Sequence, residues 1–426
     1  MAASRVSTSA VVLASLVGTT IEFYDFYIYG TAAALVLGSL FFPPGAPGAQ
    51  SLAAFLTFGI AFVARPLGAF LFGHFGDRIG RKSTLVMTML VMGLSTALIG
   101  LLPPYGAVGL LAPVLLCLLR LGQGLGLGGE WGGAALLAVE NAPAGRKAWF
   151  GMFPQLGPSV GFLLANGLFL LLALTLSDAQ FLAWGWRVPF IVSLLLVLIG
   201  LYVRQRLGET PAFARLAAQG GRVRVPLGHV LHHHAWPLVL GSVSMVVCYV
   251  VFYVATVFAL DYGTRVQHLP RGEFLGLLCG AILFMAAATP ISARLADRFG
   301  CRAVLIISCL VTALSGFAAP ALLGAGDAAH AFVFLALQLT LMGLLFAPMG
   351  ALLPDLFPAH VRYTGSSAAY SLGGVLGGSL APYAAQQLLT HGGLAWVGYY
   401  ITGAALLSLM ATLALPRTAP SDEGKY

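Results

Sequence analysis

The sequence predicts an all-α integral membrane protein with about twelve transmembrane helices in two pseudo-symmetric six-helix bundles. Of its 426 residues, 59% are apolar and only 8% are charged, whereas a soluble domain has roughly 25% charged residues. The mean hydropathy is +0.91. Apolar runs of about 20 residues, the length that spans a bilayer as a helix, recur along the whole chain. No water-soluble surface can be built from this composition.

The predicted spans begin and end where the apolar runs do. In the first half they cover residues 11–38, 51–73, 84–102, 108–139, 148–175 and 188–204, and in the second half 236–260, 273–294, 302–323, 330–353, 363–388 and 394–415. The first run is not a signal peptide, because it carries Glu22 and Asp25 and has no cleavage site. It therefore counts as the first span.

The basic residues predict the orientation. With the N-terminus inside, 17 of the 22 Lys and Arg residues fall in cytoplasmic segments, Arg187, Arg265 and Arg271 lie outside, and Arg65 and Arg120 fall within spans. Cytoplasmic loops carry such an excess of Lys and Arg, so both termini are predicted to be cytoplasmic. The net charge of +8 does not indicate a nucleic-acid partner, because the basic residues form only short clusters between apolar runs.

Two sequence echoes predict an internal duplication. The segment 76–80 recurs at 296–300, an offset of 220 residues, and the segment 140–143 is echoed by 355–358 at an offset of 215. Transporters are often built from repeated bundles. The predicted domains are an N-terminal six-helix bundle at 1–204, a cytoplasmic linker at 205–235 and a C-terminal six-helix bundle at 236–426.

Arg120 is a charged residue well inside an apolar run. The glycines that follow it, at three- and four-residue spacing, leave a smooth helix face that a neighbouring helix can approach closely. A guanidinium in this place is costly unless it meets an anion, so Arg120 is predicted to mark a functional site. The alternative is a permanent pair with a carboxylate that only locks two helices together.

The predicted partners of Arg120 lie in the first span. Glu22 and Asp25 are three residues apart and share a helix face, which Tyr29 continues one turn later. Two carboxylates so close in a low dielectric cannot both ionise cheaply, so one of them is expected to take up and release a proton. The alternative is that both acids only make static contacts within the bundle.

The loop at 73–82 joins two spans in few residues and carries three glycines, Asp77, Arg81 and Lys82. It resembles the loop signature of the major facilitator superfamily, which implies that Asp77, Arg81 and Glu140 hold a cytoplasmic gate closed. Asp297 and Arg362, from the echoed segments of the second half, are predicted to belong to the same gate. Simple positive-inside anchoring is the alternative. A Walker A loop is excluded, because Arg81 replaces the glycine that should precede the lysine.

Further motifs make the resemblance closer. Segments 22–27, 65–68, 73–82, 128–134, 185–190, 209–211 and 354–365 together resemble the metabolite:proton symporter family of the major facilitator superfamily. The resemblance covers essentially the whole chain. It implies the major facilitator fold, a bacterial-type inner membrane, small metabolites as substrates, mostly carboxylates or zwitterionic osmolytes, and the proton as coupling ion with no other cofactor.

A looser similarity to sugar porters implies that Arg120 pairs with Asp25 or Glu22 and that Gln155 lies on the cavity wall. Arg65 is assigned either to a carboxylate substrate or to the gate. In the second half no charged residue falls at mid-span. The full set of predicted substrate-binding residues is Arg120, Arg65, Tyr29, Gln155, Glu130, Tyr249, Tyr253, Gln338 and Tyr370.

The leading hypothesis is proton-coupled symport of a mono-, di- or tricarboxylate by alternating access, with Asp25, Glu22 and Arg120 coupling the proton. A zwitterion symporter of the proline or betaine type is the alternative, and a non-transporting membrane receptor is a third hypothesis. No catalytic motif indicates an enzyme. The odd set of five cysteines has no CxxC pair, so neither disulfide nor metal is expected. The expected partners are a small-molecule substrate and the lipid bilayer, and the chain is expected to be a monomer.

Overall fold

The computed structural model describes residues 8–45, 48–79, 81–128, 130–140, 142–206, 226–358 and 361–416. All regular structure in these ranges is helical, and they contain no β-strand. This agrees with the physics of a bilayer, where a helix satisfies its own backbone hydrogen bonds without water. The prediction of an all-helical membrane protein is confirmed.

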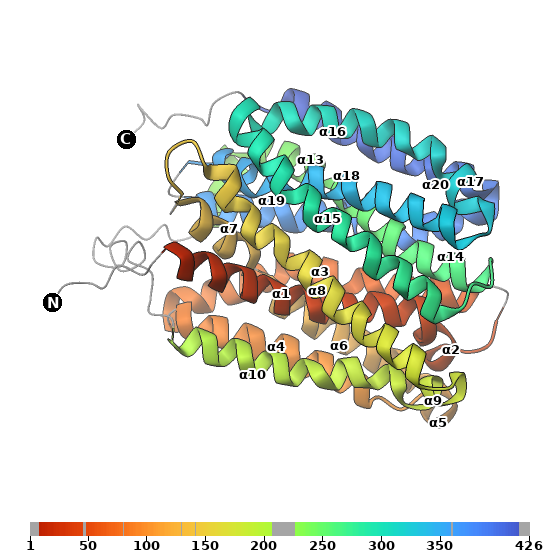
Figure 1. Cartoon of the computed structure of the whole chain (residues 1–426). Helices are drawn as coiled ribbons and strands as arrows, with labels where there is room; N and C mark the ends of the chain where they lie inside the picture. The colour runs from red at the N-terminus through yellow and green to blue at the C-terminus, as the bar shows by residue number, and fades with distance from the viewer. Residues whose placement is uncertain are drawn as a thin grey trace.

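The helices form two groups that lie side by side (Figure 1). The first group comprises α1 (Thr8–Ala32), the π-helical turn η1 (Ala33–Leu37), α2 (Gly38–Phe41), α3 (Ala49–Ile79), α4 (Arg81–Leu101), α5 (Tyr105–Val108), α6 (Leu111–Leu127), α7 (Glu130–Glu140), α8 (Lys147–Thr175), α9 (Asp178–Ala183), the 3₁₀ turn η2 (Gly185–Arg187) and α10 (Val188–Arg206).

The second group begins after residues 207–225, which lie outside the described residues. These residues make up most of the predicted linker. It comprises α12 (Pro226–His233), α13 (Ala235–Tyr253), the π-helical turn η3 (Val254–Phe258), α14 (Ala259–Arg265), α15 (Arg271–Phe299), α16 (Cys301–Ser315), the 3₁₀ turn η4 (Gly316–Ala318), α17 (Ala319–Leu322), the 3₁₀ turn η5 (Leu323–Ala325), α18 (Ala328–Asp355), α19 (Arg362–Gly377) and α20 (Ala381–Ala414).

Every predicted span coincides with helix, although several are broken. Among the described residues, 9 runs of helix are long and apolar enough to cross a membrane. One of them, Arg362–Ala414, holds 53 residues and two crossings, because the chain reverses at Gly392 and Gly393, whose backbone angles are not helical. The α4 crossing contains the shorter apolar helix Val86–Leu101. The fourth crossing is split at Gly128 into α6 and α7.

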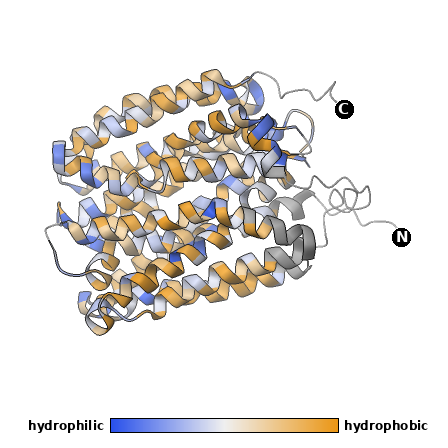
Figure 2. Ribbon diagram, turned by 180° about the vertical axis from the view of Figure 1, so that it is seen from behind, coloured by the Kyte–Doolittle hydropathy of each residue, from blue (hydrophilic) through white to orange (hydrophobic). Residues whose placement is uncertain are grey.

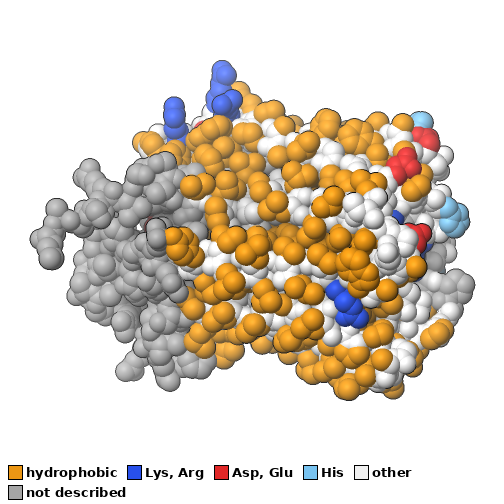
Figure 3. Space-filling view, turned by 60° about the horizontal axis from the view of Figure 1, so that its bottom comes forward, with side chains coloured by type: hydrophobic (Ala, Val, Ile, Leu, Met, Phe, Trp, Pro, Cys, Tyr) orange, Lys and Arg blue, Asp and Glu red, His pale blue; other side chains and the backbone are white. Residues whose placement is uncertain are grey.

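The outer faces of the helices are apolar. Large side chains such as Leu118, Leu198 and Leu314 are 57%, 63% and 71% exposed, which suits contact with lipid rather than water. Hydrophobic colouring runs along the whole length of most helices (Figure 2). On the face seen in Figure 3, hydrophobic side chains cover the middle and acidic side chains and histidines gather at one end. The chain is therefore a multi-pass membrane protein.

Glycines allow α3 and α6 to pack closely. A Cβ added at Gly124 would lie 2.6 Å from Ala64 Cβ and 2.7 Å from Ala61 Cα, distances that real Cβ atoms almost never show. A Cβ at Gly128 would likewise meet the carbonyl oxygen of Arg65. The smooth face predicted after Arg120 therefore exists, and it places the backbone of α3 at Arg65 directly against the end of α6.

Gly124→Ala is expected to lower the free energy of unfolding by about 1–3 kcal/mol, because the added methyl overpacks the α3–α6 contact. The measurement is the thermal unfolding midpoint of the purified protein in detergent. Gly167→Ala on α8 is the matched control, because a Cβ there meets nothing within 4 Å. The control should keep or raise the midpoint, and an equal fall in both variants would contradict the packing argument.

The two groups of helices touch along several crossings. The α8 helix packs against α15 and α18, the α3 helix packs against α19 and α20, and α7 packs against α18 and α19. The turns η1 and η3 also meet, together with α14. Helices far apart in the sequence therefore enclose a common centre, and the functional site is sought there.

Candidate functional site

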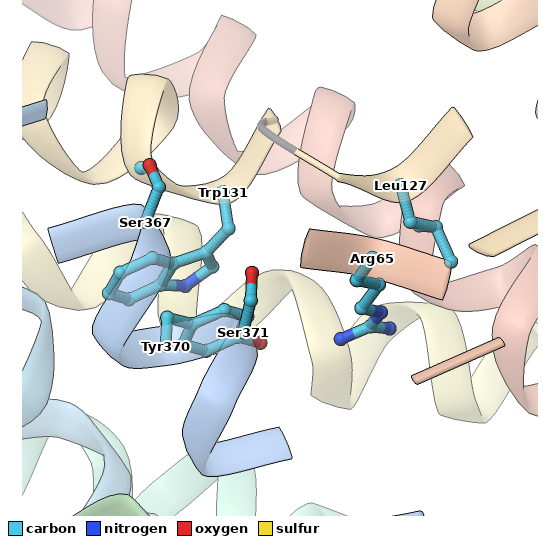
Figure 4. Close-up of a pocket in the computed structure, with 7 residues that line it drawn as sticks. Arg65, Leu127, Trp131, Ser367, Tyr370 and Ser371 are labelled. Carbon is cyan, nitrogen blue, oxygen red and sulfur yellow. The ribbon is translucent and has the colours of Figure 1, made fainter. Parts of the chain in front are cut away.

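A small buried cavity lies between the two helix groups (Figure 4). It contains about 220 Å³ of space not filled by atoms and is lined by Arg65, Leu127, Trp131, Gly132, Ser367, Tyr370 and Ser371. The first four residues come from α3, α6 and α7, and the last three from α19. All seven lining residues are buried, so this conformation is closed around its centre.

Arg65 is the cation of this cavity. Its side chain is buried, with its Cζ 4.6 Å from the ring centroid of Phe26 and 4.8 Å from that of Phe62. Such cation–π contacts favour a guanidinium away from water. Its Nε donates no hydrogen bond within the described residues. A buried charged donor without an acceptor is costly, so the geometry suits an anion that supplies one.

Trp131 and Tyr370 form the other wall and join the two helix groups. Their rings are stacked with centroids 4.0 Å apart and planes 4° apart, as the parallel rings in Figure 4 show. The indole Nε1 of Trp131 donates to Gln155 Oε1 at 2.9 Å, and Gln155 Nε2 donates to the carbonyl of Phe346 at 2.9 Å. Gln155, predicted to face the substrate, thus holds Trp131 in place and bridges α8 to α18.

A second cavity adjoins the first at Tyr370. It contains about 270 Å³ of space not filled by atoms. Its lining consists of Phe23, Tyr27, Pro158, Cys248, Tyr249, Phe252, Tyr253, Met342, Phe346 and Tyr370. The predicted binding residues Tyr249, Tyr253 and Tyr370 therefore meet around neighbouring cavities. The Tyr249 hydroxyl also donates to the backbone carbonyl of Tyr370 at 3.3 Å.

Arg120 lines neither cavity. It is fully buried, and it donates to Gln123 Oε1 at 2.7 Å and to the carbonyls of Phe58 at 2.8 Å and Thr57 at 3.4 Å. Its Cζ lies 3.8 Å from the ring centroid of Tyr29. The Tyr29 hydroxyl in turn is bonded to Thr57 Oγ1 at 2.5 Å. Arg120 and Tyr29 therefore tie α1, α3 and α6 together beside the central site.

The expected direct pair between Arg120 and Asp25 is replaced by a chain of hydrogen bonds. Gln123 Nε2 donates to Thr96 Oγ1 at 2.7 Å, and Thr96 Oγ1 lies 3.4 Å from Asp25 Oδ2. Asp25 Oδ1 has no hydrogen-bond partner in the described part of the chain. The physical reason for the difference is that Asp25 faces α4 rather than α6. Glu22 is also buried.

Two other predicted binding residues have different outcomes. Gln338 lines neither cavity, because its Nε2 donates to Ser315 Oγ at 3.1 Å and so joins α18 to α16 within the second helix group. Glu130 is the first residue of α7, but its side chain lies outside the described part of the structure. Ser367 and Ser371 belong to no sequence pattern that marked them as binding residues. Trp131 lies within the glycine-rich segment 128–134, and that motif was the sequence feature that could have identified it.

One end of the central region is closed by a set of contacts that we name the near latch, comprising Lys147, Ala148, Trp149, Arg294, Asp297 and Asp355. The amides of Ala148 and Trp149 donate to the two carboxylate oxygens of Asp297 at 2.8 and 3.0 Å. Lys147 pairs with Asp355 at 3.0 Å, and the guanidinium of Arg294 lies over Trp149. Each contact joins α8 to the second helix group.

Asp297 acts in the near latch as a helix cap supplied from another part of the chain. The N-cap residue of α8, Arg146, makes no side-chain cap bond, and the Asp297 carboxylate accepts from the first turn instead. A negative charge at a helix N-terminus is favourable. The near latch lies at the end of the molecule where α1 begins (Figure 1) and where Arg302 donates to the carbonyl of Leu415 at 2.9 Å.

The other predicted gate residues are less connected. Asp77 and Arg81 belong to α3 and α4, but their side chains lie outside the described residues. Glu140 is exposed at the end of α7. Arg362 Nε donates to the carbonyl of Phe357 at 3.2 Å, a bond within its own helix group. Among the predicted gate residues whose side chains are described, Asp297 is the one that contacts the opposite group.

The opposite end is closed by the far latch, which comprises Ser51, Asp178, Asp261, Arg265 and Arg271. Ser51 Oγ on α3 donates to Asp261 Oδ1 at 3.1 Å, and Arg265 Nε pairs with the same oxygen at 2.8 Å. Arg271 pairs with Asp178 at 2.5 Å. No sequence pattern marked Asp261 as a contact of this kind. With both latches closed, the two helix groups are in contact at both ends of the central region.

Comparisons with known proteins agree with this geometry. Residues 10–221 match the family model "Sugar (and other) transporter", and residues 271–426 match the model "Major Facilitator Superfamily". The inner membrane metabolite transport protein YhjE of Escherichia coli (strain K12) is 52% identical over 417 residues, which cover 97% of this chain and 95% of that protein.

The chain belongs to the major facilitator superfamily. Other relatives in this superfamily are the shikimate transporter of Escherichia coli (strain K12), 40% identical over 95% of this chain and 93% of that protein, and the proline/betaine transporter of Salmonella typhimurium, 32% identical over 96% and 83%. A partially occluded inward open structure of the xylose transporter XylE has the same fold, with a TM-score of 0.76, 16% identity and 96% and 99% of the two chains covered. This member of the superfamily is a transporter and not an enzyme.

In the near latch, Asp297→Asn is expected to raise the rate of N-ethylmaleimide labelling of Cys248 by about 10- to 100-fold. Cys248 lines the second cavity and is fully buried. The loss of a charge-assisted cap, worth about 1.5–3 kcal/mol, shifts the population toward the state open on that side. Mass spectrometry of the labelled peptide gives the rate. Asp327→Asn is the control, because Asp327 bonds only to His330 among the described contacts; equal rates in both variants would argue against the latch.

In the far latch, Ser51→Ala is expected to raise Cys248 labelling by a few-fold from the side opposite the termini, because one hydrogen bond to Asp261 is worth about 1 kcal/mol. A maleimide that cannot cross membranes, added to either side of oriented vesicles, distinguishes the two directions. Ser39→Ala is the matched control, since the Ser39 hydroxyl bonds to Val36 within its own segment. Faster labelling from the terminal side would show that Ser51 does not close the far end.

Proposed function

We propose that this chain is a proton-coupled symporter of a small organic anion that works by alternating access. The observation that carries the proposal is Arg65, a buried guanidinium in a closed cavity between the helix groups, whose Nε has no acceptor among the described residues. Charged residues inside a membrane usually mark a substrate or ion path. A carboxylate matches the planar fork of a guanidinium and would satisfy it.

The two latches support alternating access. Each latch consists of a few polar contacts between the helix groups, at opposite ends of the cavity. Opening either latch alone exposes the cavity to one side of the membrane. We assign the near latch to the cytoplasmic side, with both termini cytoplasmic and the chain in the inner membrane, as the loop charges indicate and as the name of YhjE supports.

Asp25 is the proposed proton carrier. It is 1% exposed, and Thr96 Oγ1 lies 3.4 Å from one of its carboxyl oxygens. An ionised carboxylate in such surroundings would cost several kcal/mol, so this conformation suits the neutral acid. The relay through Thr96 and Gln123 would then rearrange when the proton leaves. Glu22, three residues earlier, remains a second candidate for the same role.

Phe26 is the proposed link between the proton and the anion. Its ring centroid lies 4.6 Å from the Cζ of Arg65 and 5.2 Å from that of Arg120. The ring therefore sits between the arginine of the cavity and the arginine of the relay, directly after Asp25 in the chain. A change in the charge of Asp25 would shift Arg120 and so alter how Phe26 supports Arg65. Each chain holds all these parts, so we take a monomer as the working unit, with the proton as the coupling ion.

A zwitterionic osmolyte is the second candidate substrate. The second cavity is rich in aromatic rings, and aromatic faces attract quaternary ammonium groups. The proline/betaine transporter is among the relatives. Shikimate, proline and betaine each carry one carboxylate, which either candidate would place at Arg65. The two candidates therefore differ in the charge of the rest of the substrate.

The test is uptake into proteoliposomes of radiolabelled shikimate, 2-oxoglutarate, citrate and proline betaine. We expect at least one anion to accumulate when the interior is made alkaline, and accumulation to stop when the pH gradient is collapsed. Asp25→Asn should lose the dependence on the gradient but retain exchange of labelled for unlabelled substrate. Arg65→Gln should weaken transport by at least tenfold, because a charge-assisted hydrogen bond is lost.

Protein-free liposomes and Asp327→Asn serve as controls, the latter because Asp327 lies at a helix start outside the cavities. Uptake that ignores the pH gradient would refute proton coupling. Undiminished uptake by a variant that combines Arg120→Ala with Asp25→Asn would also refute the proposed coupling mechanism. Preference for proline betaine over all three anions would favour the second candidate.

A further inference from the structure

Histidines gather where α12 ends and α13 begins, away from the residues that the proposed function uses. His232, His233 and His234 are consecutive, and His229 stands one helical turn before His233. Consecutive residues cannot share one face of a helix, but residues four apart can. His229 and His233 therefore form a pair on one face of α12.

The two rings of this pair lie close together. Their centroids are 4.4 Å apart and their planes differ by 19°. Two imidazoles bound to one metal ion at about 2.0–2.1 Å, with about a right angle between the two bonds, have ring centres about 4.5 Å apart. The rings of His229 and His233 already have this spacing, and rotation about their side-chain bonds would direct one nitrogen of each toward a shared ion.

Neighbouring groups orient both rings. His233 Nδ1 lies 3.3 Å from the backbone carbonyl oxygen of His229. With the proton on Nδ1, the ring donates to this carbonyl and keeps the lone pair of Nε2 for a metal, an arrangement that is usual for histidine ligands. The ring of His229 also lies 5.8 Å from that of the buried His234, centroid to centroid. His233 is exposed and His229 is half-buried, so an ion can reach the pair from solvent.

The surroundings limit which ion the pair can hold. Among the described residues, no group of three or more His, Cys, Asp or Glu side chains is arranged to hold a metal ion, so the pair supplies two ligands and water supplies the others. Imidazole suits Zn²⁺, Ni²⁺ and Cu²⁺, whereas Mg²⁺ and Ca²⁺ prefer oxygen ligands. The position near the end of α12 also favours a cation, because the C-terminal end of a helix carries partial negative charge.

We propose that His229 and His233 form a binding site for one divalent transition-metal ion, Zn²⁺, Ni²⁺ or Cu²⁺, on the surface of α12. The ion bridges successive turns of a helix that is only 8 residues long, and so short a helix is marginal without support from its surroundings. The fully buried Val230 and the packing of α12 against α13 and α19 give part of that support. A bound metal would order α12 further.

The test is isothermal titration calorimetry of the full chain, purified in detergent through an affinity tag that contains no histidine. Cu²⁺ is expected to bind more tightly than Ni²⁺ or Zn²⁺, in line with the general order of divalent-metal affinities, and Mg²⁺ is expected not to bind. His229→Gln and His233→Gln should each weaken Ni²⁺ binding by at least about tenfold, because one of two imidazole ligands is lost. His232→Gln is the matched control, since His232 is also exposed on α12 but lies on a different face of the helix.

Hydrogen–deuterium exchange of the wild-type chain gives a second measurement, which does not depend on how well a variant folds. Ni²⁺ should slow the exchange of the backbone amides of α12, because the metal joins two of its turns. Mg²⁺ at the same concentration is the control and should leave the exchange unchanged. The double variant that combines His229→Gln with His233→Gln should show no slowing with either ion.

The contradicting outcomes are distinct. Ni²⁺ affinity of the wild-type chain no greater than that of the double variant would overturn the inference. Equal weakening by His232→Gln would also overturn it, since that result would indicate an adventitious ion only, held loosely along the histidine tract. Unchanged exchange in α12 with Ni²⁺ bound would place the ion elsewhere. None of these results bears on transport, because the proposed function uses none of these histidines.

Discussion

The cost of burying charge in a membrane is the constraint on which this structure depends. Two arginines lie in the helix core, and each is supported differently. Arg120 is satisfied by backbone carbonyls and a glutamine, so it serves as a fixed joint. Arg65 is held between aromatic rings and keeps a donor, its Nε, that no described residue accepts from. Rings support a cation without occupying its hydrogen bonds, which leaves Arg65 stable in the protein and still able to receive an anion.

The interface between the helix groups uses different kinds of contact at its ends and in its middle. Its ends are joined by short polar contacts, as at Asp297 and Asp261, and its middle by aromatic rings such as the Trp131–Tyr370 stack. Polar contacts at an end can exchange with water when that end opens, whereas stacked rings need a replacement surface when they part. A bound ligand would supply that surface. The free energy gained when a ligand fills the centre would therefore offset the free energy lost when the contacts at one end break. Two conformations of similar free energy require such a balance.

Much of the fold could be read from the sequence, because apolar runs of spanning length leave few alternatives to a helix. The same reading found Arg65, Gln155, Tyr249, Tyr253 and Tyr370, all of which lie in or beside the central cavities. The predictions from sequence were wrong where the spacing of residues along one helix was used to infer their contacts with another helix. Asp25 or Glu22 was expected against Arg120, but Asp25 faces α4, and Gln123, one turn from Arg120, accepts from the guanidinium instead. Gln338 turns into its own helix group for the same reason.

The cap that Asp297 provides for α8 has a consequence for local stability. The first turn of this helix has no cap from its own segment, so its amides are satisfied only while the two helix groups are together at that end. When they separate, the turn loses its acceptors and should fray, which returns backbone entropy to the open state. Amide hydrogen exchange at Ala148 and Trp149 would then follow the position of the gate. The backbone entropy of a single helical turn would thus contribute to the free-energy difference between the closed and open states.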